Sequence, residues 1–108
     1  MSNMTDAELV EAVAREILEW ENPIIEGDTA YIALTDNVFN NVWKSFDPFT
    51  DLNDLLIVLE KHDKWEIVRT AVYTVNIWIA PGEIKQASSI FLPRAVLEAA
   101  LMAERSEK

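Results

Sequence analysis

Residues 65–80 read WEIVRTAVYTVNIWIA, and this stretch decides the fold class. It is rich in β-branched and aromatic residues, which favour strands, so we expect strands over 65–70 and 72–80. In the second of these, Val75 and Ile77 are separated by a polar residue. That period of two predicts a strand with one apolar face, half-buried against another element.

The pattern continues towards the C-terminus. Pro81-Gly82 predicts a turn, and residues 84–88 predict a third strand. Strands that follow one another with short connections pair antiparallel. Pro93 then suits the first turn of a helix, because its missing N–H costs no hydrogen bond there. The alanine-rich run to Ala103 lets this last helix approach a sheet closely.

The N-terminal segment is amphipathic. Thr5 and Glu8 have the spacing of a capping box, in which each side chain accepts the other residue's backbone N–H. We expect a helix over 6–20 that ends before Asn22-Pro23, because the residue before a proline avoids helical geometry. Its apolar face spans about 100° of arc and consists of Leu9, Val10, Val13, Ile17 and Trp20.

The remaining segments give a second helix and a less regular middle. Thr50 or Asp51 can cap a helix over 51–62. Residues 29–34 predict a short strand, and residues 36–46 predict a helical turn or a packed loop. The order of elements predicts the α+β class: an antiparallel sheet of about two to four strands packed with about three helices, similar to an α/β/α sandwich.

The length and the charge of the chain indicate how many domains it forms and what kind of surface it has. A chain of 108 residues, half of them hydrophobic, suits one domain over 1–108, with frayed ends over 1–4 and 104–108. The formal net charge is −10, and residues 1–36 carry nine acidic residues against Arg15. We predict that the first helix turns outward a row of uncompensated carboxylates that bind a partner; these are Glu8, Glu11, Glu16 and Glu19. A solvated face that only keeps the protein soluble is the alternative.

The acidic surface also limits the partners. Anionic lipid and nucleic-acid backbones repel it, so we expect no direct nucleic-acid binding and no membrane binding. The acidic N-terminus lacks the basic start of a signal peptide, and the apolar runs are shorter than the ~20 residues that span a bilayer. The lack of cysteine fits a reducing compartment. We therefore predict a cytoplasmic protein.

Catalytic chemistry has few candidates. Without cysteine there is no thiolate nucleophile or thiolate metal site, and two glycines make no phosphate loop. His62 lies near a helix end, where a capping or packing role is expected. Asp47, Asp51 and Asp54 lack the glycine that a calcium loop requires. We predict that the protein is not an enzyme and has no catalytic residue, no metal and no cofactor.

Trp78 falls on the polar face of its strand, with Thr74 and Asn76. If the other face packs on helices, Trp78 is covered by a second helix layer or exposed at an interface, and aromatic residues often anchor interfaces. We predict Trp78 as a further partner-binding residue. In one version Trp78 and the last helix form the seam of a homodimer. A separate hypothesis is a small-ligand site lined by Tyr31, Trp43 and His62.

The chain resembles a family of small phage and prophage proteins, the phage ABA-sandwich domain. The likeness lies in the opening residues 4–9 and 13–20, in the helix start at 48–52 with its end at 58–61, and in the late helix over 94–103. The resemblance implies a three-layer α/β sandwich and a phage context. It implies no defined activity and no catalytic residues.

These features favour a small, acidic, non-enzymatic phage or prophage binding protein. A concrete version is an inhibitor of host defence that occupies the basic, nucleic-acid-binding surface of a host protein, steered by long-range attraction. The alternative is a self-assembling structural or accessory phage protein without nucleic-acid mimicry. A third reading is an enzyme or ligand binder hidden in residues 24–49.

Overall fold

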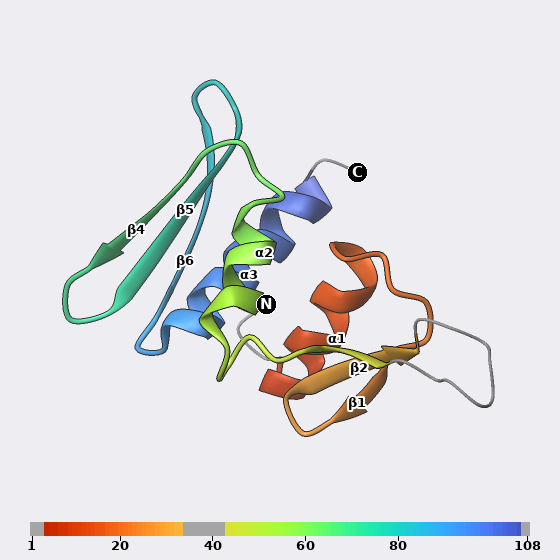
Figure 1. Cartoon of the computed structure of the whole chain (residues 1–108). Coiled ribbons are helices and arrows are strands. Elements are labelled where there is room, and N and C mark those ends of the chain that lie inside the picture. Colours follow the sequence, from red (N-terminus) through yellow and green to blue (C-terminus); the bar gives the residue numbers. More distant parts are fainter. Residues whose placement is uncertain (1–3, 34–42, 107–108) are drawn as a thin grey trace.

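The computed structural model describes residues 4–33 and 43–106. Three helices and six strands follow one another in these residues (Figure 1). Their order is α1 (Asp6–Glu16), β1 (Ile24–Glu26), β2 (Thr29–Ala33), β3 (Trp43–Phe46), α2 (Leu52–Leu59), β4 (Trp65–Arg69), β5 (Tyr73–Ala80), β6 (Glu83–Ser89) and α3 (Leu92–Ser106).

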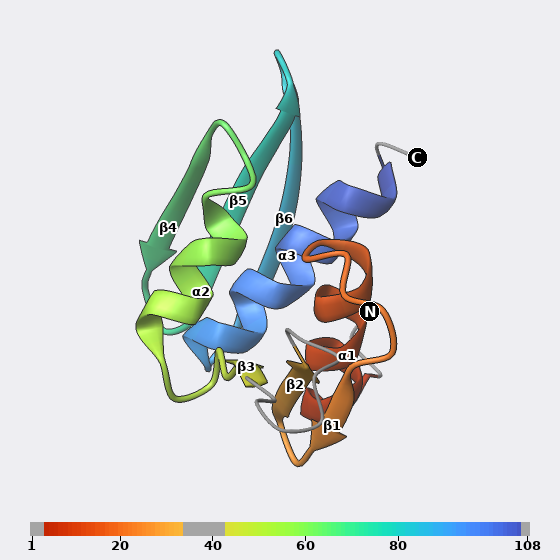
Figure 2. The ribbon, with the colours of Figure 1, turned by 45° about the vertical axis from the view of Figure 1, so that its right-hand side comes forward.

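The strands form two antiparallel sheets, in the orders β1-β2-β3 and β4-β5-β6. α3 packs on β5 and β6, α1 packs on β1 and β2, and α3 contacts both other helices. The helices therefore lie between the two sheets, as Figures 1 and 2 show. The predicted α+β class is confirmed. The order of layers differs from an α/β/α sandwich, because the N-terminal strands form a sheet of their own.

The first helix begins as predicted and ends earlier. Its capping box is formed: Thr5 Oγ1 accepts the backbone N–H of Glu8 at 3.1 Å, and Glu8 Oε1 accepts that of Thr5 at 2.8 Å. The helix ends at Glu16, four residues before Trp20. Glu19 adopts a φ of 59°, a left-handed conformation that stops a right-handed helix.

The described residues between the first two helices contain three strands. Gly27-Asp28 forms the turn between β1 and β2, and Gly27 has a φ of 61°, which glycine adopts without strain. The prediction of a helical turn or packed loop over 36–46 is wrong for Trp43–Phe46, which is β3. Pairing with β2, in the register Ala30↔Phe46, overrides the local helical spacing. The rest of that prediction, with Leu34, lies outside the described residues.

The second half follows the predictions closely. Asp51 caps α2, and its side chain accepts the backbone N–H of Asn53 at 2.9 Å. Strands β4, β5 and β6 form in the three segments that were predicted to be strands. α3 continues to Ser106, so the tail predicted to fray from residue 104 begins within the last helix. The predicted frayed ends at 1–3 and 107–108 lie outside the described residues.

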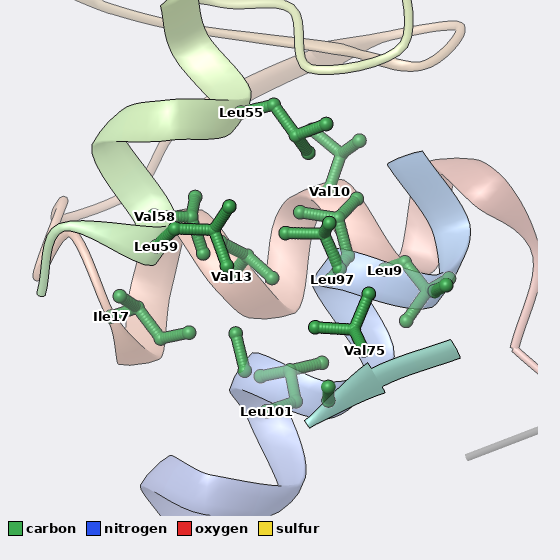
Figure 3. Packing of buried hydrophobic residues seen from close by; sticks show 14 of the residues in the cluster. Leu9, Val10, Val13, Ile17, Leu55, Val58, Leu59, Val75, Leu97 and Leu101 are labelled. Atoms are coloured by element: carbon green, nitrogen blue, oxygen red, sulfur yellow. The ribbon is translucent and has the colours of Figure 1, made fainter. Parts of the chain in front are cut away.

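The core lies where the three helices meet the inner face of β5 (Figure 3). Its side chains come mainly from the apolar arc of α1, from one face of α2 and from both flanks of α3. Figure 3 labels Leu9, Val10, Val13, Ile17, Leu55, Val58, Leu59, Val75, Leu97 and Leu101. Within the described ranges, no helix is both long and apolar enough to cross a membrane.

α1 and α3 run side by side in the same direction. Arg94, in the first turn of α3, reaches Asp6 in the first turn of α1, with Nη1 and Oδ1 2.8 Å apart. Arg105, in the last turn of α3, reaches Glu16 in the last turn of α1, also at 2.8 Å. Arg94 also donates to the backbone carbonyl of Met4. Ion pairs therefore join the N-terminal and the C-terminal helix of the described chain at both of their ends.

Candidate functional site

The structure gives the glutamates of α1 separate roles. Glu8 belongs to the capping box. The backbone N–H of Thr5, with a smaller contribution from its hydroxyl, holds the pKa of Glu8 below its ordinary value of 4.5. Its carboxylate is exposed, but it is tied to the start of its own helix.

Glu11 and Glu16 are paired with arginines. Arg15 Nη2 lies 3.0 Å from Glu11, one turn along the same helix. Arg105 binds Glu16 through two nitrogens, at 2.9 and 2.8 Å, and this hydrogen bonding raises the pKa of Arg105 above its ordinary value. The expectation of an uncompensated row of carboxylates is therefore wrong for Glu11 and Glu16.

Arg94 adds a further link between the acidic helix and the last helix. Besides Asp6, it contacts Glu98, with Arg94 Nε 2.8 Å from Glu98 Oε1. Glu98 is a buried charged residue, 8% exposed, and Arg94 supplies its countercharge. The compensating arginines lie almost ninety positions from Asp6 and Glu16, at separations of 88 and 89 residues. Charge counting along the sequence cannot find such partners.

Four carboxylates just after the helix are also uncompensated. In the described part of the chain no basic side chain forms an ion pair with Glu19, Glu21, Glu26 or Asp28. Glu19, Glu21 and Glu26 are exposed. Of the four predicted glutamates, Glu8 and Glu19 form no ion pair within the described residues, but Glu19 lies beyond the end of α1.

The β1-β2-β3 sheet carries a hollow on its outer face. Cross-strand partners Ile24 and Tyr31 lie on that face, and Glu26 shares it because it follows Ile24 by two positions. Trp43 lies on the same face, diagonal to Tyr31, since Tyr31 pairs with Ser45. The four side chains line an open cavity of about 260 Å³. We refer to it as the β1–β3 hollow.

The hollow is apolar, aromatic and acidic at once. Ile24 is 49% exposed and Trp43 is 51% exposed, although both are large apolar residues. The opposite face of the same sheet is the one that packs on the core, through Ala30 and Phe46. Tyr31 and Trp43, two of the three residues proposed to line a pocket, therefore do meet. His62 lies elsewhere, just after α2, where its backbone N–H donates to Leu59 at 3.0 Å.

Trp78 lies on the outer face of the other sheet. Lys64 Nζ lies 4.6 Å from the centre of the Trp78 ring, a cation–π contact within the chain. Across the same face a polar row connects three strands, from Glu66 to Asn76 at 2.9 Å and from Gln86 to Asn76 at 2.8 Å. Trp78 is half-buried and already has a cation against it.

The structure does not support the homodimer seam predicted from Trp78 and the last helix. Trp78 faces away from α3, which packs against the face that holds Val75 and Ile77. The residues of α3 from Ala95 to Leu101 are buried inside the protein. Trp78 and α3 therefore present no common surface. Among the described elements, the second helix layer expected over Trp78 is likewise not found.

Comparison with known proteins yields one informative match. No family model matches the chain, and no curated protein matches it. The fold is similar to the crystal structure of a phage protein from Bacillus cereus ATCC 14579, with a TM-score of 0.66 and 19% sequence identity. The similarity covers 93% of this chain and 87% of that one. At this identity the match establishes a shared fold, in keeping with the phage resemblance of the sequence, while the ABA-sandwich assignment has no matching family model.

Proposed function

We propose that the protein is a non-enzymatic phage or prophage protein that binds a basic surface of a host protein in the host cytoplasm. The observation that carries this proposal is the β1–β3 hollow, which combines Tyr31 and Trp43 with the carboxylate of Glu26. The phage context is supported by the fold shared with the Bacillus cereus phage protein. The cytoplasmic setting is part of the proposal.

The chemistry of the hollow favours a cationic side chain. Aromatic rings attract an arginine guanidinium or a lysine ammonium through their negative faces, and a nearby carboxylate adds charge. Ile24 offers apolar contact to the methylene stem of such a side chain. An arginine or lysine projecting from a partner would therefore fill the site better than an apolar or anionic group would.

The uncompensated carboxylates add long-range attraction. Glu19, Glu21 and Asp28, with Glu26 in the hollow, form no ion pairs within the described residues, so their charge is available to a partner. Clustered charge of one sign raises association rates with an oppositely charged surface and makes them sensitive to salt. A host surface that normally binds nucleic acid has the required basic character, which is how an inhibitor of host defence would act.

Binding of a fluorescently labelled nona-arginine peptide provides the first test, measured by anisotropy at low and high salt. Trp43→Ser should weaken binding about tenfold, because the cation–π contact is lost. Glu26→Gln should weaken it less and flatten the salt dependence. Trp78→Ser and Glu60→Gln are matched controls on the other half of the molecule, and both should bind as the wild type does.

Two outcomes decide against the hollow. The proposal fails if Trp43→Ser and Glu26→Gln bind the peptide as tightly as their controls do. It also fails if Trp78→Ser is the variant that loses binding, because the site would then lie on the other sheet. A positive result leads to capture from host lysate with wild type and Trp43→Ser in parallel. A true host partner is then retained at low salt by the wild type alone.

A self-assembling accessory protein is the second candidate function. It is favoured by a specific feature outside the predicted seam, the exposed edge of the β4-β5-β6 sheet. All five residues of β4 are exposed, including Trp65, Ile67 and Val68. Exposed apolar edge strands are templates for pairing with another chain.

A further inference from the structure

We propose that two copies of this chain form a dimer in which β4 pairs antiparallel with β4 of the second copy, centred on Ile67. This inference is independent of the proposed host-protein binding, which uses the other sheet. β4 is an edge strand in the order β4-β5-β6, and Figures 1 and 2 show it on the outside of the molecule.

Two backbone hydrogen bonds show which groups of β4 point outward. The N–H of Trp78 donates to Lys64 at 3.1 Å, and the N–H of Thr70 donates to Val72 at 2.9 Å. In an antiparallel ladder the residues that bond to a given neighbour alternate. The even-numbered positions of β4 therefore bond to β5. The N–H and C=O groups of the odd-numbered positions point to the outer edge; these are Trp65, Ile67 and Arg69.

The same three residues place their side chains on the face that carries the helices. Ile67 pairs with Val75 and Trp65 pairs with Ile77, and both β5 residues are fully buried. Trp65 and Ile67 nevertheless remain 37% and 36% exposed, because α3 packs over β5 and β6. β4 thus offers outward backbone groups and incompletely covered apolar side chains at the same positions.

A second copy fits this edge because the sequence of β4 is self-complementary about Ile67. In that register Ile67 faces the partner's Ile67, and Trp65 faces the partner's Arg69. Every outward N–H then meets an outward C=O. The guanidinium of Arg69 already lies 5.6 Å from the Tyr73 ring, and in the dimer it would also face the indole of the partner's Trp65.

The opposite edge of the sheet is less suited to pairing. On β6 the outward-pointing positions include Gln86 and Ser88. Their side chains are already hydrogen-bonded, to Asn76 and Thr74. Ile84 is the remaining outward-pointing position and is 46% exposed, so this edge offers one apolar side chain where β4 offers both Trp65 and Ile67.

A dimer made through one short strand is small. Interfaces below about 1,200 Å² are typical of weak, transient association. We therefore expect a concentration-dependent equilibrium in sedimentation velocity, with monomer at micromolar concentration and dimer approaching millimolar. Hydrogen exchange at high concentration should protect the Ile67 amide, which faces solvent in the monomer.

Ile67→Pro tests the register directly. Proline at this position removes an outward N–H and leaves the even-numbered hydrogen bonds to β5 in place. We expect dimerisation to weaken at least about tenfold with the β4–β5 amides still protected. Gln86→Pro is the matched control, because it removes an outward N–H from the other edge, and it should dimerise as the wild type does.

A charge series tests the same register without proline. Trp65→Lys places a second cation opposite the partner's Arg69 and should abolish the dimer, whereas Trp65→Glu should retain it through a cross-strand ion pair. The proposal is overturned if the wild type stays monomeric up to about 1 mM. It is also overturned by a dimer that Ile67→Pro and Trp65→Lys leave intact, or by a dimer whose Ile67 amide exchanges as fast as in the monomer.

Discussion

The two sheets have the same number of strands, but their outer faces differ in the side chains that they carry. The β4-β5-β6 sheet has strands of five, eight and seven residues, and its outer face is crossed by the polar row through Asn76. The β1-β2-β3 sheet has strands of three, five and four residues. Its outer face shows Ile24 and Trp43 to solvent. The longer sheet hydrogen-bonds part of its outer face internally, although Val68 and Ile84 are exposed there, whereas the shorter sheet combines its exposed apolar residues with a hollow.

The attachment of the sheets to the helices also differs. β5 lies directly on α3, with Val75 and Ile77 fully buried. The shorter sheet is held through fewer large side chains, chiefly Phe46, which is 2% exposed and meets the Trp20 ring edge-on at 6.3 Å. Phe46 is the largest buried side chain that the short sheet contributes to the core, beside Ala30 and the partly buried Ile25.

Phe46→Ala should have the largest effect on stability. Removing a buried phenylalanine and leaving a cavity lowers the free energy of unfolding by about 3–5 kcal/mol. Urea denaturation measures the loss, and hydrogen exchange should show that the amides of β1–β3 lose protection before those of β4–β6. Trp43→Ser, on the outer face, should change stability by less than about 0.5 kcal/mol. Equal losses in the two variants would mean that both faces of the short sheet are structural.

The second largest effect is expected at Arg94. Arg94→Met leaves the buried carboxylate of Glu98, and that of Asp6 in the first turn of α1, without their cation. The free energy of unfolding should fall by about 2–4 kcal/mol. Arg105→Met removes an exposed pair with Glu16 and should cost less than about 1 kcal/mol. Thermal unfolding of the two variants side by side measures the difference. If Arg105→Met is the more harmful change, the two helices are joined mainly at their C-terminal ends.

The smallest effect concerns the start of α1. The folded-state pKa of Glu8 lies below 4.5, so its contribution to stability is present above pH 4.5 and disappears as pH falls through the folded pKa. Thr5→Ala should cost about 1 kcal/mol at neutral pH through loss of the cap. NMR titration should show the Glu8 pKa rising in this variant, but only part of the way, because the backbone N–H of residue 5 remains. An unchanged Glu8 pKa would show that the Thr5 hydroxyl contributes nothing.

Local signals predicted the elements whose neighbours are close in sequence. The capping box at Thr5, the cap at Asp51 and the three strands after Trp65 each depend on residues a few positions apart. β3 was missed because Trp43–Phe46 pairs with β2 across the segment 34–42, and its own apolar spacing is helical. Pairing partners of that kind leave no periodic trace in the strand itself.

The surface was harder to predict than the fold. Local charge density predicted an acidic ridge, but Glu16 is neutralised by an arginine from the far end of the chain. The sequence placed Trp78 on the outer face of its strand, but its cation comes from Lys64, the residue just before β4. The sequence suggested a pocket that contains Tyr31 and Trp43. The pairing of β2 with β3 places the two residues diagonally across the ladder, where both line the hollow. Glu26 carried no signal beyond its charge.

The parallel pairing of α1 with α3 has a consequence for biosynthesis. A ribosome delivers the apolar arc of the first helix well before the helix that covers it, because α3 follows every other described element in the chain. Until then Leu9 and Val13 of the nascent chain lack much of their packing surface, and contacts this distant in sequence slow folding. The core therefore cannot close until α3 has left the ribosome, and until then the growing polypeptide exposes apolar residues to which chaperones can bind.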